Sequence, residues 1–134
     1  MAEAPKNSPR PLSPHLQIYR WPLGMAMSIM HRASGAALAV GTLMIIWMLL
    51  AAAYGPSAWQ DFNDFASSGL GQVMLFGWTA ALFYHLCNGV RHLIWDTAHL
   101  FKLENANRAG LVVLLAAAIM TALFWCAASP WKGE

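Results

Sequence analysis

Three long stretches of this sequence contain no Asp, Glu, Lys or Arg, and they constrain the fold more than any other feature. They cover residues 33–60, 65–90 and 109–131. Each exceeds the roughly 20 residues that an α-helix needs to cross the hydrocarbon core of a membrane. Only 10% of all residues are charged, whereas a soluble domain has about a quarter. Because a backbone in lipid must satisfy its own hydrogen bonds, the three stretches predict helices.

The predicted fold is therefore an all-α membrane protein. Its three transmembrane helices are expected near residues 22–54, 67–95 and 108–128. Residues 1–21 carry four prolines and predict an extended segment at the membrane surface. Residues 22–134 form the anchor domain. Because three helices alone make a thin bundle, we expect neighbouring helices from another subunit in a larger helical bundle.

The distribution of cations predicts the orientation in the membrane. All Lys and Arg residues except Lys132 lie near the N-terminus or around the second connection, whereas the first connection has Asp61 and Asp64 and no cation. The positive-inside rule then places the N-terminus in the cytoplasm and the C-terminus in the periplasm. This describes a bacterial inner membrane, and the cytoplasmic side would be the matrix side in a mitochondrion.

The second predicted helix ends in the polar run HLCNGVRHLIWD. His85 and His92 are seven residues apart, so they share one helix face with Asn88, Gly89 and Asp96. An ionisable side chain within a membrane span indicates a functional site. A neutral imidazole there is a suitable axial ligand for haem iron, and a nearby glycine leaves room for a flat macrocycle.

Small residues at four-residue spacing flank His85. Gly77, Ala81 and Gly89 lie on the same side of the helix, and such stripes let helices approach closely in lipid. His85 is then expected to face protein or cofactor rather than lipid. Alanine-rich helices also produce such stripes by chance, so this argument alone does not decide the orientation.

The first predicted helix carries a second polar cluster, SIMHRASG. Ser28 and Arg32 are four residues apart and share a face, while His31 is offset from Arg32 by about 100°. Two interpretations of Arg32 stay open. It could extend to the lipid headgroups, or it could join Ser28 in binding a carbonyl oxygen or an acidic propionate.

Both clusters, together with RPLSPHLQIY near the N-terminus, resemble motifs of the succinate dehydrogenase cytochrome b556 subunit family, a membrane anchor of respiratory complex II. The family pattern is Ser-x-x-His-Arg-x-Ser/Thr-Gly on the first helix and His-x-x-x-Gly-x-Arg-His-x-x-x-Asp on the second. The chain matches both without gaps. The resemblance runs from Arg10 to about Arg108, and the third helix shares only its apolar character.

The resemblance implies a haem b held between two anchor subunits. His85 would be its axial ligand, and His31, Arg32 and His92 would surround the propionates. Only one histidine lies deep in the second helix, so a second hydrophobic anchor subunit is expected to supply the other axial ligand.

The resemblance also implies a ubiquinone site, lined by Ser28 and Arg32 and bordered by a polar network that includes Asp96. A flavoprotein subunit with FAD would oxidise succinate, and an iron–sulfur subunit would pass the electrons on. This chain would anchor both subunits in the lipid membrane and help to form the quinone site. It would thus link the tricarboxylic acid cycle to the respiratory chain without oxidising succinate itself, and no nucleic-acid partner is expected.

Two alternatives stay open from the sequence. The chain could be the cytochrome b anchor of another quinone-linked oxidoreductase such as fumarate reductase, although such anchors more often keep both haem ligands in one longer chain. It could also be a non-redox membrane assembly subunit with structural histidines.

Overall fold

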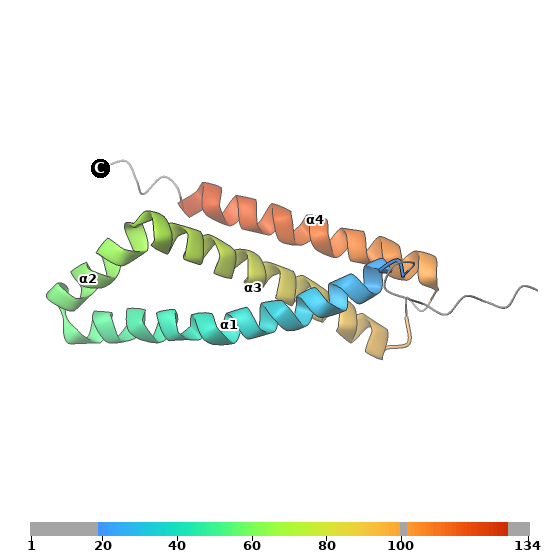
Figure 1. The fold of residues 1–134 in the computed structure, drawn as a ribbon, viewed down its shortest axis with the longest axis horizontal. Coiled ribbons are helices and arrows are strands. Elements are labelled where there is room, and N and C mark those ends of the chain that lie inside the picture. The colour runs from blue at the N-terminus through green and yellow to red at the C-terminus, as the bar shows by residue number, and fades with distance from the viewer. Residues whose placement is uncertain (1–18, 100–101, 129–134) are drawn as a thin grey trace, which may run out of the picture.

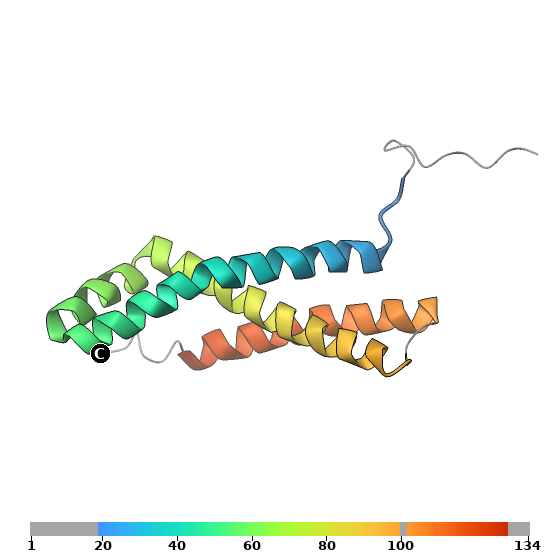
Figure 2. The ribbon, with the colours of Figure 1, turned by 90° about the horizontal axis from the view of Figure 1, so that it is seen from below.

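The computed structural model describes residues 19–99 and 102–128, and this part of the chain contains four helices and no strand. The helices are α1 (Leu23–Tyr54), α2 (Pro56–Ser67), α3 (Gly69–Asp96) and α4 (Leu103–Ala128). Helices α1, α3 and α4 run side by side with alternating direction (Figures 1 and 2). All three are long and apolar enough to cross a membrane. The all-α fold with three candidate spans is confirmed, whereas most of the predicted extended segment, residues 1–21, lies outside the described residues.

Helix α4 begins at Leu103, five residues before its predicted start. The charged residues near Arg108 had predicted a loop. In the structure Glu104 and Arg108 form an ion pair of 2.6 Å one turn apart, and a pair at this spacing stabilises a helix. The first turn of α4 is therefore charged but helical.

Helix α2 was not predicted, because its polar residues indicated a loop. Pro56 occupies its first turn, where the missing N–H costs no hydrogen bond. Phe62 is buried on one side and meets the Trp47 ring of α1 edge-on at 5.2 Å. Gly55 alone separates α2 from α1, and its φ of 111° favours glycine. The first connection is thus an amphipathic helix packed against α1.

The three long helices pack through few side chains. Met27, Tyr84, Val113 and Ala117 form the buried core where α1, α3 and α4 meet. Gly110 permits the contact between α1 and α4, since a Cβ there would lie 2.7 Å from Met27 Sδ. Most other large apolar side chains are exposed, which is typical of a surface that faces lipid or other subunits.

Candidate functional site

Three histidines from two helices converge where α1 crosses α3. The His31 ring of α1 stacks on the His85 ring of α3, with centroids 4.0 Å apart and 9° between the planes. The His92 ring lies 5.2 Å from His31 at a tilt of 52°. The prediction that His85 and His92 share a face is confirmed, because both side chains project toward His31.

The hydrogen bonds around His85 define its tautomer. Ser34 donates its hydroxyl hydrogen to the His31 carbonyl over 2.8 Å. The Nδ1 atom of His85 lies 3.0 Å from the Ser34 hydroxyl oxygen and 3.2 Å from the same carbonyl. Both neighbours can then only accept, so Nδ1 carries the ring hydrogen. The Nε2 atom consequently keeps its lone pair, as a metal-binding histidine requires.

Two glycines shape the space around His85. A Cβ at Gly35 would lie 3.1 Å from His85 Cε1, so only a residue without a side chain lets α1 come this close. Gly89, one turn further along α3, has no atom within 4 Å of the position that a Cβ would take. The imidazole is therefore covered on its α1 side, and the helix surface beside it is open.

The structure leaves three of the predicted site residues apart from the histidine cluster. Ser28 is half-buried, and Arg32 and Asp96 are exposed. Within residues 19–99 and 102–128, none of the three side chains makes a hydrogen bond or an ion pair. Ser28 and Arg32 lie on the flank of α1 beside His31, and Asp96 is the last residue of α3. Their polar groups are thus available to a ligand or to another subunit.

Arg91 is buried and connects all three spans. It is 4% exposed, and its guanidinium donates to the Ala106 carbonyl of α4 over 3.0 Å and to Asn88 Oδ1 over 3.3 Å. It also lies 3.6 Å from Met27 Sδ of α1 and 4.0 Å above the Trp95 ring. No carboxylate of the described residues pairs with it. A backbone carbonyl, a side-chain amide, a thioether sulfur and an aromatic ring therefore take the place of a counter-ion.

The Arg91 network borders the histidine cluster. Asn88 is fully buried and its Nδ2 lies 3.4 Å from His92 Nε2, while Trp95 meets the His92 ring edge-on at 5.0 Å. Asn88 and Trp95 also contact Arg91. The same two side chains therefore help to position His92 and help Arg91 to pack the three helices together.

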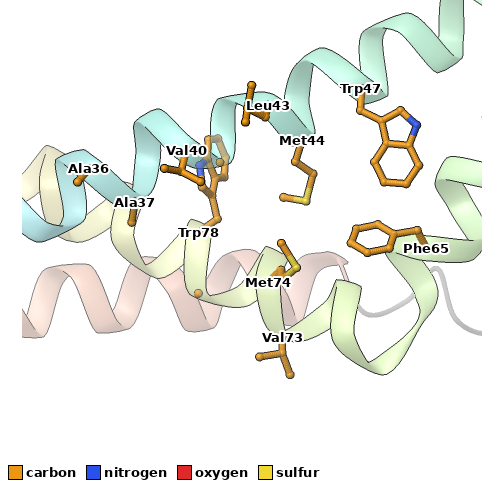
Figure 3. A pocket seen from close by; sticks show the side chains of 12 residues that line it. Ala36, Ala37, Val40, Leu43, Met44, Trp47, Phe65, Val73, Met74 and Trp78 are labelled. Carbon is orange, nitrogen blue, oxygen red and sulfur yellow. The ribbon is translucent and has the colours of Figure 1, made fainter.

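An apolar groove of 720 Å³ lies between α1 and α3, toward the α2 end of the bundle. Figure 3 shows Trp47 and Phe65 at one end of this groove and Trp78 at the other, with Met44 and Met74 between them. A second groove, of 660 Å³, lies between α3 and α4. Neither contains the histidine cluster.

No individual role was predicted for Ser34, Asn88 or Arg91, although all three lie in the two polar motifs and Asn88 was placed on the face of His85. Ser34 follows His31 by three residues and therefore shares its helix face, a spacing that could have indicated the contact. Arg91 belongs to the polar run that indicated a functional site, but its partners were not predicted. Nothing in the sequence indicates that the Ala106 carbonyl of another helix lies beside it.

The family described as the succinate dehydrogenase/fumarate reductase transmembrane subunit matches residues 6–124. The chain belongs to this family. It is 40% identical over 114 residues to the succinate dehydrogenase cytochrome b556 subunit of Paracoccus denitrificans, an alignment that covers 85% of this chain and 88% of the relative. The corresponding subunit of Rickettsia felis is 35% identical over 116 residues, and the alignment covers 87% of this chain and 90% of the relative. The mitochondrial succinate dehydrogenase cytochrome b560 subunit of Sus scrofa is 40% identical over 114 residues, and the alignment covers 81% of this chain and 66% of the relative.

The family resemblance inferred from the motifs is confirmed. This transmembrane subunit is a multi-pass membrane anchor of succinate dehydrogenase and thus part of an enzyme complex. The relatives described above are named as subunits of succinate dehydrogenase and not of fumarate reductase.

Proposed function

We propose that this anchor subunit binds haem b through His85 and helps to form the ubiquinone-reduction site of succinate dehydrogenase. The observation that carries the haem assignment is the hydrogen bonding of His85 Nδ1 to Ser34 and the His31 carbonyl, which leaves Nε2 free to bind iron. The cytochrome b in the names of the relatives supports it. When bound, a haem would supply one-electron redox chemistry to the site.

Other features around the histidine cluster also fit a haem. The surface of α3 at Gly89 is open and can lie against a flat macrocycle. His31 is half-buried and stacks on His85 in the same cluster, and we assign its ring to the surroundings of the propionates. His92 and Arg32 add further donors for the same carboxylates.

The arrangement of the rings supports a shared haem. The rings of His31 and His85 are parallel and stacked, so they would not hold one metal ion between them. We propose that His85 would be the haem ligand of this chain and that another chain would supply a second ligand. The partner is a second hydrophobic anchor subunit, and the complex is completed by an iron–sulfur subunit and a flavoprotein with FAD.

Ser28 and Arg32 are proposed to bind the quinone. The Arg32 guanidinium is a cation that only donates hydrogen bonds, so it can stabilise negative charge that develops on a quinone oxygen. Ser28 lies one turn away on the same flank and offers a hydroxyl. Asp96 lies at the same end of the bundle, where α3 ends, and its exposed carboxylate is proposed to join a polar network beside the quinone.

We place this end of the bundle on the cytoplasmic side of a bacterial inner membrane, or on the matrix side in a mitochondrion. Helix α1 has 32 residues, more than the roughly 20 that span the hydrocarbon core. Its charge-free part after Arg32 is sufficient for crossing. Arg32 then lies at the boundary of the core, within reach of subunits in the aqueous phase.

The experiment that tests the haem assignment is the reduced-minus-oxidised absorption spectrum of membranes carrying the whole complex. The replacement His85→Leu removes the proposed ligand without adding charge, and we expect the low-spin b-type spectrum to change or disappear. The matched control is His99→Leu, because His99 is exposed and its ring contacts only Thr97. A wild-type spectrum in His85→Leu would refute the ligand role.

A further inference from the structure

Ser34 occupies an unusual place for a hydroxyl in a membrane span. It is buried, and its oxygen takes part in two contacts at once. It donates to the His31 carbonyl within its own helix over 2.8 Å, and it lies 3.0 Å from His85 Nδ1 across the helix interface. A serine in a helix often bonds to its own backbone, but that bond alone would not require contact with a second helix.

The contact with His85 depends on the close approach of the two helices. Gly35 follows Ser34, and a Cβ at Gly35 would lie only 3.1 Å from the His85 ring. One turn earlier on α1, the His31 ring stacks on the His85 ring at 4.0 Å. Three residues of α1, namely His31, Ser34 and Gly35, thus surround the imidazole. Among them, Ser34 supplies the side-chain oxygen that lies next to Nδ1 and can accept its hydrogen bond.

We infer that Ser34 is the positioning residue of the haem ligand, because it holds His85 in the Nδ1–H tautomer and fixes the direction of its Nε2 lone pair. This inference rests on the proposed haem function. A hydrogen bond to the outer nitrogen of a ligating histidine fixes the ring and raises the basicity of the ligating nitrogen. A more basic ligand favours the oxidised iron, so Ser34 keeps the haem midpoint potential lower than it would otherwise be.

The test is a potentiometric titration of the haem in the intact complex, together with the rate at which haem is lost from it. In Ser34→Ala the more distant His31 carbonyl, 3.2 Å from Nδ1, remains as a partner, so haem should still bind. We expect a higher midpoint potential and a haem affinity lower by about tenfold, the small end of the range for such outer contacts. Ser34→Thr restores the hydroxyl and should return both quantities toward the wild-type values.

The matched control is Thr42→Ala. Thr42 also lies on α1 and donates to a backbone carbonyl, that of Leu38, over 2.9 Å, but it has no histidine neighbour. Its removal should leave the potential and haem retention unchanged. If Ser34→Ala does not assemble, Ser34→Cys serves in its place, since a thiol is only a weak acceptor.

The outcomes separate this inference from the haem proposal on which it rests. An unchanged potential and unchanged haem retention in Ser34→Ala, beside an altered spectrum in His85→Leu, would overturn the role of Ser34 alone. Equal shifts in Ser34→Ala and Ser34→Thr would assign the effect to packing and would also overturn it. An unaltered spectrum in His85→Leu would refute the haem proposal itself.

Discussion

The Arg91 guanidinium of α3 donates a hydrogen bond of 3.0 Å to the Ala106 carbonyl of α4. The two residues belong to different spans, at the end of the bundle where α3 finishes and α4 begins. The same guanidinium holds the side-chain oxygen of Asn88, a residue that has no exposed surface. A single cation therefore joins two helices and satisfies a buried amide.

Replacement Arg91→Leu should destabilise the complex. It leaves Asn88 Oδ1 buried without a donor, which costs about 1–3 kcal/mol. The midpoint of thermal inactivation of the purified complex measures the effect. Arg108→Leu is the matched control, because Arg108 is exposed and pairs only with Glu104, and such pairs contribute about 0.2–0.5 kcal/mol. Equal stability of the two variants would contradict the role given to Arg91.

Replacement Arg32→Leu should separate quinone chemistry from succinate oxidation. It removes a charged donor, whose hydrogen bond contributes about 1.5–3 kcal/mol, so succinate-to-quinone activity should fall by about 10- to 100-fold. Succinate oxidation with a soluble artificial acceptor should persist, because we propose that other subunits carry out that chemistry. Ser28→Ala should give a smaller loss of the same kind, about fivefold.

The same pair of assays decides between the interpretations of Arg32. Loss of both activities, together with loss of the complex from the membrane, would make it an assembly residue. Retention of both activities would mean that it only extends to the lipid headgroups.

Replacement His92→Leu should affect the haem spectrum less than His85→Leu. His92 contacts Asn88 and the His31 ring, and its proposed partners are the propionates rather than the iron. We expect a low-spin spectrum with a shifted potential, measured by redox titration of the membranes. A spectral loss as large as that in His85→Leu would assign His92 to the iron instead.

Replacement Gly41→Ala should weaken the crossing of α1 and α3. A Cβ at Gly41 would overlap the Trp78 indole, which is also held by a bond of 3.4 Å to the Leu38 carbonyl. Such overpacking costs about 1–3 kcal/mol. Gly24→Ala is the control on the same helix, since it meets no atom within 4 Å and alanine favours a helix. The amount of complex retained in detergent at rising temperature should fall for Gly41→Ala only.

The proposed orientation is tested with a reporter that is active only in the periplasm. A fusion after Ser68, at the end of α2, should be active, and a fusion after Lys102 should be silent. The reason is the excess of cations around the second connection. The opposite pattern would invert the topology.

The spans could be predicted because each depends on one local property, an apolar stretch long enough for the membrane. Helix α2 could not be predicted from the length of an apolar stretch, because a short amphipathic helix has the polar composition of a loop. Its signal was Pro56 followed by Phe62, whose burial depends on Trp47 of another helix. Helix α4 began earlier than predicted for a related reason, because charge in a first turn is compatible with a helix.

The sequence predicted which site residues share one face of a helix, but not which residues of different helices come into contact. The seven-residue spacing of His85 and His92 indicated a shared face, and the structure agrees. The stacking of His31 on His85, and the contact of the Ser34 hydroxyl with His85 Nδ1, depend on how α1 crosses α3. That crossing is set by Gly35 and by the packing around Met27, which no periodicity in one helix reveals.

Helix α2 also determines the width of the opening between α1 and α3. Its 12 residues extend about 18 Å and separate the two spans at one end, whereas the spans converge at the histidines, so that the three helices outline a triangle (Figure 1). The apolar groove of 720 Å³ occupies the wide side of this triangle. Helix α2 thus holds the two spans apart, and a connector one turn shorter would draw them together and narrow the groove without altering any residue of the histidine cluster.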